Sequence, residues 1–341
     1  MTEDLVDPDT SLEADWVCVH TFLDAAHDEL ITDCIGPLAL ALTEEGHVQR
    51  WFFLRYWEGG PHVRLRLLPH RRADRAAIER RAVETVNAYL AANPVPDLVD
   101  RVQFAANAAN LAELEGRTEY DSYVRPNNHV EVATYVREHA DYGRGAAIAV
   151  VEKHFHDSSL LALKVLQSGA PVPLRANVAF DLMVANFAMC DDLRDRWSAI
   201  AGLSTPFGTG EESPDVIVQY ERQKESLRDR LTATWRLTDR VERREDVGDG
   251  YLAFWLRSQF ELRERLGELE DDGTFTTEWP ESPLARPLDL PSTRHPGTLL
   301  VLLRCAHLVV NRMGLSLWEE VQVRYLVGYV LKDHPQLLVR S

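Results

Sequence analysis

Hydrophobic and polar positions follow two different periods along the chain, and the change lies near residue 146. Before it, short runs rich in β-branched and aromatic residues predict strands over 16–23 and 129–136. Helical composition predicts helices over 24–45 and 72–92, the second ended by Asn-Pro-Val-Pro. From residue 146 onward, apolar residues recur at helical spacing in most of the remaining chain.

The clearest local signal is a β-hairpin over 51–68, WFFLRYWEGGPHVRLRLL, in which two strand-like runs flank a Gly-Gly-Pro turn. Because side chains alternate along a strand, His62, Arg64 and Arg66 share one face, and the opposite strand adds Arg55. Arginines held side by side on a sheet suit a carboxylate, which accepts paired N–H donors. The alternative is a solvated basic face that pairs with acidic helices of the same chain.

The order of elements predicts an α+β fold. An antiparallel, ferredoxin-like βαββα part over 15–145 packs on a mainly helical part over 146–341, as one integrated domain. Residues 1–14 are polar and form a flexible tail. An irregular, proline-rich stretch over 271–297 is long enough for a lid or a peptide-contacting loop.

Near the C-terminus, Arg304, His307 and Asn311 lie on one stripe of an otherwise apolar helix. Such a stripe indicates a polar cavity or a partner. The alternative is a core histidine bonded to a backbone carbonyl, with Arg304 reaching solvent. The next helix begins with Ser316-x-x-Glu319, which predicts a capping box.

A third candidate is the pair Arg137-Glu138, which follows the strand over 129–136 and precedes a glycine-containing loop. Strand ends that lead into such loops often carry catalytic groups. Taken alone, the pair favours an exposed salt bridge.

Composition narrows the class of protein. The 341 residues are 45% hydrophobic and 27% charged, as in an ordinary globular protein, and their net charge of −17 disfavours duplex DNA and anionic membranes as partners. The N-terminus lacks an apolar signal segment, and no run is long enough to span a membrane, so we expect a cytoplasmic protein.

Several chemistries can be set aside. The four cysteines form no C-x-x-C pair, and His154 and His156 are two apart in a helix, so we expect no metal site. Nucleotide-binding, zinc-protease and serine-hydrolase motifs are absent from the sequence, and we expect no cofactor.

Three motifs occur in a recognisable order: WFFLRYWEGGPHVRLRL (51–67), YVREHADYGRG (135–145) with EKHFHDSS (152–159), and HLVVNR (307–312). With them the chain resembles, over 16–333, the C-terminal domain of lantibiotic dehydratases. This domain also occurs as free-standing proteins of thiopeptide-type bacteriocin biosynthesis. The resemblance implies an enzyme that modifies a ribosomally made precursor peptide, leader plus core.

In that family the domain eliminates glutamate from glutamylated Ser or Thr to give dehydroalanine or dehydrobutyrine, after a separate glutamylating dehydratase part has formed the ester. By matching positions, Arg64 and Arg66 correspond to the glutamate-site arginines, Glu138 to an acidic active-site residue and His307 to a histidine required for elimination. Preorganised cations and a base suit this chemistry. Four further residues are expected to bind substrate: Arg55, His62, Arg304 and Asn311.

One departure from the family pattern keeps a second reaction open. The family usually has a basic residue before Tyr-Gly-Gly, whereas this chain has Asp141 before Tyr142-Gly143-Arg144. Free-standing relatives in thiopeptide pathways are pyridine synthases, which join two dehydroalanines in a formal [4+2] cycloaddition and then expel water and the leader. The retained residues favour elimination as the first prediction: Arg64, Arg66, Glu138 and His307. Asp141 and the free-standing length favour the pyridine synthase, and a non-catalytic leader-binding scaffold is the second alternative.

Overall fold

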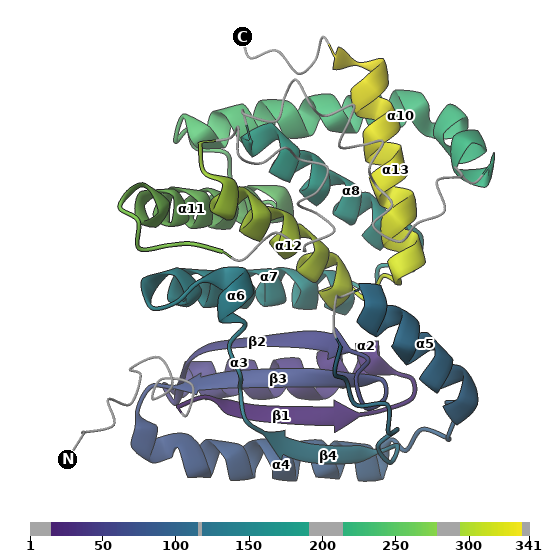
Figure 1. Cartoon of the computed structure of the whole chain (residues 1–341), viewed down its shortest axis with the longest axis vertical. Helices are drawn as coiled ribbons and strands as arrows, with labels where there is room; N and C mark the ends of the chain where they lie inside the picture. Colours follow the sequence, from purple (N-terminus) through teal and green to yellow (C-terminus); the bar gives the residue numbers. More distant parts are fainter. Residues whose placement is uncertain (1–14, 115–117, 191–213, 278–293, 336–341) are drawn as a thin grey trace. The chain divides into compact units, whose positions relative to one another are not determined.

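The computed structural model describes residues 15–114, 118–190, 214–277 and 294–335 (Figure 1). The described chain forms two compact units. The sheet unit comprises residues up to 139 together with 144–168, and the helical unit comprises 140–143 and the residues from 169 onward. The α+β prediction is confirmed. The predicted tail over 1–14 and most of the proline-rich stretch lie outside the described residues.

A four-stranded antiparallel sheet forms the centre of the sheet unit. Its order is β2-β3-β1-β4, with the strands at Val17–Phe22 (β1), Val48–Tyr56 (β2), His62–Pro69 (β3) and His129–Ala133 (β4). The predicted hairpin is confirmed as β2 and β3. Its turn contains Gly59 and Gly60 at φ angles of 76° and 115°, a region that favours glycine because other residues have a Cβ.

Helices cover one face of this sheet. In chain order these are α2 (His27–Leu30), a π-helical turn (Ile31–Ile35), α3 (Gly36–Glu44), a short 3₁₀ turn (Arg72–Asp74) and α4 (Arg75–Ala92). Helix α5 (Arg101–Leu114) follows α4 in the chain and belongs to the same unit. In α4 the buried side chains recur every four residues, at Ile78, Ala82, Val86 and Leu90, and α4 packs against β1 and β4. The apolar sides of the strands, such as Val19 and Leu65, are therefore buried beneath helices.

Helix α7 (Ala146–Gln167) also belongs to the sheet unit. It lies along the edge strand β2, where the Phe53 amide donates to Ser159 Oγ at 3.2 Å and the His156 ring contacts the Trp51 backbone. The sequence predicted a boundary between the two parts at residue 145, which would assign α7 to the helical part. In the structure α7 belongs to the sheet unit, because its hydrogen bonds to β2 satisfy an otherwise open sheet edge.

Among its described residues, the helical unit contains the short α6 (His139–Tyr142), which begins in the sheet unit, and five longer helices: α8 (Val172–Met189), α10 (Pro214–Glu242), α11 (Tyr251–Asp271), α12 (Pro296–Arg312) and α13 (Leu317–Asp333). The predicted capping box at the start of α13 is confirmed, since the Glu319 amide donates to Ser316 Oγ and the Ser316 amide donates to Glu319 Oε2. None of the described helices is long and apolar enough to cross a membrane.

Candidate active site

The sheet face that carries the predicted arginines is polar and aromatic. Strand pairing places Cys18 opposite Arg66 and His20 opposite Arg64, and the same register brings β2 aromatic side chains beside them. Alternation along β3 therefore puts His62, Arg64 and Arg66 on this face, as the sequence predicted. We call it the arginine face.

Arg55 is an exception. It pairs in register with Val63, which points to the other side of the sheet, and its Nη2 lies 2.5 Å from Asp28 Oδ1. The sequence placed Arg55 with the cluster because it stands on the neighbouring strand. That grouping is wrong, since the register shifts Arg55 out of phase with Arg64.

Arg64 is held by groups of its own hairpin. Its Nε donates to His62 Nε2 at 2.9 Å, and its guanidinium carbon lies 3.7 Å from the centroid of the Tyr56 ring. Its Nη2 is 3.6 Å from the carboxylate of Glu58. The cation is therefore stacked on an aromatic ring and already has an acidic neighbour.

Arg66 is the most buried member of the arginine face, with 7% of its surface exposed. Its guanidinium carbon lies 4.2 Å from the Tyr135 ring centroid and 5.2 Å from that of Phe52. Although burial acts to lower the pKa of Arg66, Tyr135, Cys18 and Glu138 raise it, and the raising effects prevail. Within the described chain, its Nε has no hydrogen-bond partner. A buried donor left unpaired costs about 1–3 kcal/mol, so Arg66 is ready to receive an oxygen of a ligand.

Two histidines beside the arginines are kept neutral. Burial, with Arg64 next to them, lowers the pKa of His20 to about 2 and that of His62 to about 3. The tautomer of His62 follows from its partners, because Nε2 accepts from Arg64 and Nδ1 therefore donates to the Gly60 carbonyl at 2.8 Å. His20 was not among the predicted site residues. Because His20 lies two residues after Cys18 in the same strand, both side chains point to the arginine face.

The two residues of the pair Arg137-Glu138 differ in burial and in their partners. Arg137 is buried and bonds to Glu152 of α7 through two contacts, Nε to Oε1 at 2.7 Å and Nη2 to Oε2 at 2.9 Å. The predicted exposed salt bridge is therefore wrong, because the carboxylate that binds Arg137 comes from a helix and lies in the interior. Glu138 itself is exposed, and its charge acts on Arg66.

In the helical unit, His307 lies against a buried carboxylate. Its Nδ1 is 2.7 Å from Glu320 Oε2, and Glu320 Oε1 accepts from Arg324 Nε and Nη2 at 3.0 and 2.5 Å. Burial alone would raise the pKa of Glu320, but His307 and Arg324 hold it at about 2. The alternative of a core histidine bonded to a backbone carbonyl is wrong.

Arg304, one turn before His307 on α12, is bound by Asp141. Its Nη2 lies 2.5 Å from Asp141 Oδ1, and its Nη1 donates to the Asp141 carbonyl at 2.7 Å. Asn311, one turn after His307, is half-buried. The acidic residue that departs from the expected motif, Asp141, therefore serves as the partner of Arg304.

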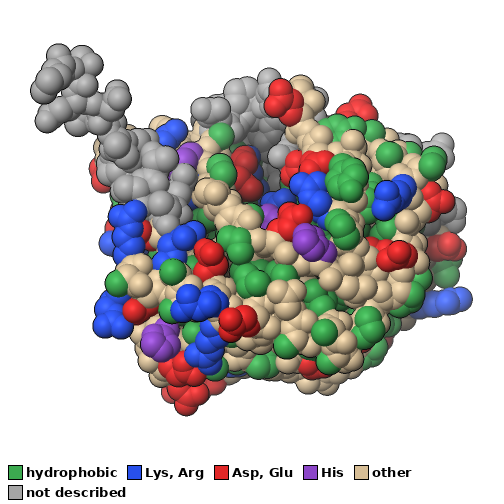
Figure 2. All heavy atoms as spheres, turned by 90° about the horizontal axis from the view of Figure 1, so that it is seen from below, with side chains coloured by type: hydrophobic (Ala, Val, Ile, Leu, Met, Phe, Trp, Pro, Cys, Tyr) green, Lys and Arg blue, Asp and Glu red, His purple; other side chains and the backbone are tan. Residues whose placement is uncertain are grey.

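Arg64, Arg66 and Glu138 belong to the sheet unit, whereas His307, Arg304 and Asn311 belong to the helical unit. That these groups converge on one cavity stays a prediction. On the face drawn in Figure 2, basic and acidic side chains are interspersed. In the described ranges, no group of three His, Cys, Asp or Glu side chains has the geometry to hold a metal ion.

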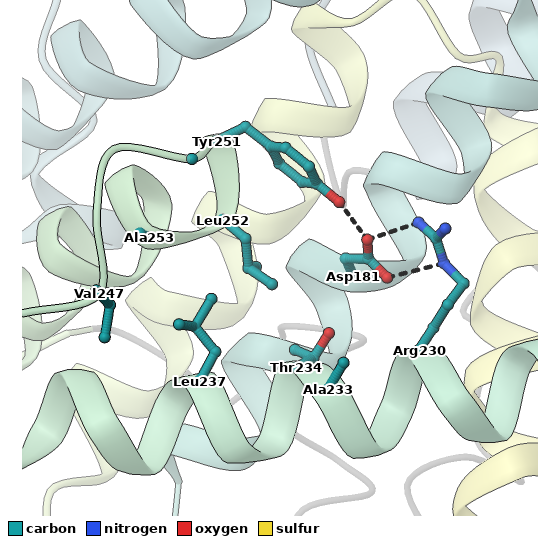
Figure 3. Close-up of a pocket in the computed structure, with 10 residues that line it drawn as sticks. Asp181, Arg230, Ala233, Thr234, Leu237, Val247, Tyr251, Leu252 and Ala253 are labelled. Atoms are coloured by element: carbon teal, nitrogen blue, oxygen red, sulfur yellow. Dashed lines mark hydrogen bonds and ion pairs between the residues drawn. The ribbon is translucent and has the colours of Figure 1, made fainter.

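The helical unit contains a cavity of about 310 Å³ that none of the predicted site residues lines (Figure 3). At its polar end Arg230 donates to both carboxylate oxygens of Asp181, and the Tyr251 hydroxyl donates to the same group. Because these polar atoms already pair with one another, the cluster ties α8, α10 and α11 together.

Residues 16–331 match the family model described as lantibiotic biosynthesis dehydratase C-term, and the chain therefore belongs to this family. It is a peptide-modifying enzyme of bacteriocin-type peptide biosynthesis. No curated protein matches the chain at a significant level.

Three solved structures share the fold. The pyridine synthase TbtD from thiomuracin biosynthesis superposes with a TM-score of 0.72 at 23% identity, over 94% of this chain and 99% of TbtD. TsrL gives 0.64 at 18% identity, over 96% of this chain and 99% of its own. The tRNA-dependent lantibiotic dehydratase MibB from Microbispora sp. 107891 gives 0.54 at 19% identity, over 94% of this chain but 28% of MibB.

Proposed function

We propose that this chain is a pyridine-forming enzyme of thiopeptide biosynthesis. It joins two dehydroalanines of a modified precursor peptide in a formal [4+2] cycloaddition and then expels water and the leader. The similarity to TbtD, which extends over nearly all of both chains, supports this choice over the elimination that the sequence favoured first.

The observation that carries the proposal is that the protein's own carboxylates already pair with its candidate cations. Asp141 binds Arg304 through its side chain and its carbonyl, and Glu58 lies beside Arg64. Glutamate elimination must bind an anionic group, and a protein carboxylate that already pairs with the cation competes with that binding. Dehydroalanine side chains are uncharged and impose no such requirement.

Arg66 suits the chemistry of an uncharged substrate. For one dehydroalanine to act as a 2-azadiene, its neighbouring amide must become an iminol, with a proton moving from nitrogen to oxygen. Negative charge develops on the carbonyl oxygen during this transfer. An N–H donor in a buried site stabilises such charge strongly, and Arg66 Nε lacks a hydrogen-bond partner among the described residues.

Two synthetic peptides test the proposal. One carries the leader and two dehydroalanines, and the other carries a glutamylated serine. We expect the first to yield a pyridine macrocycle and a free leader, and the second to remain glutamylated, as followed by mass spectrometry. Loss of glutamate from the second peptide without any pyridine from the first would refute the proposal.

Glutamate elimination is the second candidate, and one observation favours it. Arg66 is a buried guanidinium without a carboxylate bonded to it in the described chain, as a glutamate site requires. In that case a separate glutamylating subunit is the expected partner. Tight binding of the leader with turnover of neither peptide would instead indicate a leader-binding scaffold.

We further propose that the sheet is ferredoxin-like and that both units act as one integrated domain in the cytoplasm, where the precursor peptide is made. The order β2-β3-β1-β4, with helices between β1 and β2 and between β3 and β4, supports the first point. The chain passes between the units three times, next to residues 139, 143 and 168, which supports the second.

A further inference from the structure

The His307 imidazole contacts helix α13 through its Nδ1 edge, and the ring remains partly exposed. Glu320, in the first turn of α13, is 3% exposed, whereas the His307 side chain keeps 41% of its surface exposed. The contact between them joins His307 Nδ1 to Glu320 Oε2 at 2.7 Å.

Arg324 completes the arrangement from the next turn of the same helix. It donates twice to Glu320 Oε1, so both carboxylate oxygens have partners and the group stays ionised. An ionised carboxylate can only accept hydrogen bonds, so the neutral imidazole carries its proton on Nδ1. The lone pair is then on Nε2, which has no hydrogen-bond partner in the part of the chain that the structure describes.

We propose that Glu320 is a positioning residue that fixes the proton of His307 on Nδ1 and presents Nε2 as the proton-transfer atom. The assignment rests on the proposed function. Nε2 takes the proton from the amide nitrogen of the dehydroalanine that becomes the azadiene, and the electron pair moves to the carbonyl oxygen. The imidazolium then returns this proton to the oxygen, which gives the iminol and restores the neutral imidazole.

The substitution Glu320→Gln tests this role, because the hydrogen bonds from Arg324 fix the orientation of the new side-chain amide. The amide of Gln has a single oxygen, and this oxygen accepts the two hydrogen bonds that Arg324 donates. The NH₂ group of the amide therefore faces His307. An NH₂ donor facing Nδ1 requires a lone pair there, and the proton moves to Nε2. The substitution is therefore expected to invert the tautomer with little change of shape.

Nitrogen-15 NMR of histidine-labelled full-length protein measures the tautomer without any substrate. We expect His307, assigned by its loss in His307→Ala, to carry its proton on Nδ1 in the wild type and on Nε2 in Glu320→Gln. Glu319→Gln is the matched control, since it removes the same charge one residue away and Gln still serves in a capping box. The control should keep the wild-type tautomer.

Turnover of the dehydroalanine peptide gives the second readout. We expect kcat to fall about 10- to 100-fold in Glu320→Gln with KM nearly unchanged, and Glu320→Asp to recover part of the loss. An unchanged tautomer in Glu320→Gln, or a kcat equal to that of the wild type, overturns the assignment. If the wild type turns over no peptide, the proposed function fails, and the NMR result alone decides whether Glu320 sets the tautomer.

Discussion

At the scale of single residues, the arginine face combines cations with imidazoles that stay neutral. Burial beside arginine makes a second positive charge costly, so His20 and His62 remain uncharged at a pH where exposed histidines would titrate. Among the described residues, the Nε–H of Arg66 is a buried cationic donor without a hydrogen-bond partner, and it lies beside these neutral imidazoles.

The neutral histidines make stability depend on pH with a definite sign. Their pKa values are about 2 and about 3 in the folded state, below the ordinary value of about 6.5 in the unfolded chain. Below pH 6.5 the unfolded chain binds protons that the folded chain does not, so the free energy of unfolding falls as pH falls. Each histidine contributes a slope of up to about 1.4 kcal/mol per pH unit.

Urea unfolding of the wild type and His20→Asn between pH 7.5 and 5 measures this slope. The pH range stays above the pKa of ordinary carboxylates, which is about 4. We expect a flatter dependence in the variant below about pH 6.5 and parallel curves above it. Identical slopes throughout would mean that His20 is not kept neutral by the fold.

The role of Arg66 gives a second prediction at this scale. Arg66→Lys keeps the charge but loses the planar group that stacks on Tyr135 and carries the unpaired Nε–H. We expect kcat for the dehydroalanine peptide to fall about 100-fold. Arg81→Lys, at an exposed ion pair with Glu45, is the control and should leave turnover unchanged. Wild-type turnover in Arg66→Lys would remove Arg66 from the mechanism.

At the scale of elements, local patterns predicted what depends on local sequence. The hairpin follows from a glycine turn between two strand-like runs, and the start of α13 follows from Ser316 and Glu319. The hydrogen-bond partners of the candidate residues could not be predicted from local sequence. Glu152 and Glu320 are ordinary helix residues in the sequence, and only the packing of α7 and α13 brings them to Arg137 and His307. The phase of Arg55 also depends on a register that no local pattern fixes.

The ion pair between Arg137 and Glu152 joins the segment after β4 to α7. Breaking a buried pair leaves one charge without compensation, so we expect Glu152→Gln to lower the free energy of unfolding by about 3–5 kcal/mol. Glu138→Gln removes an exposed carboxylate nearby and should change it by about 0.5 kcal/mol or less. Chemical denaturation of both variants measures the difference. Equal stabilities would show that the pair does not fasten α7 to the sheet unit.

At the scale of the whole molecule, a chain with a net charge of −17 has enough carboxylates to pair with its own arginines. Asp141 with Arg304, and Asp28 with Arg55, are examples from the two units. This pairing agrees with the uncharged dehydroalanine substrate that we propose. The family could be predicted from the order of three motifs, whereas the choice between its two reactions depends on pairings that only the fold reveals.

The most direct measurement follows products from a leader peptide that carries two dehydroalanines, incubated with the full-length protein. Liquid chromatography with mass and absorbance detection quantifies macrocycle and leader over time. Our account predicts that a pyridine-absorbing macrocycle and free leader appear in equal amounts and at equal rates. A peptide recovered intact, or a leader released without pyridine, would contradict it.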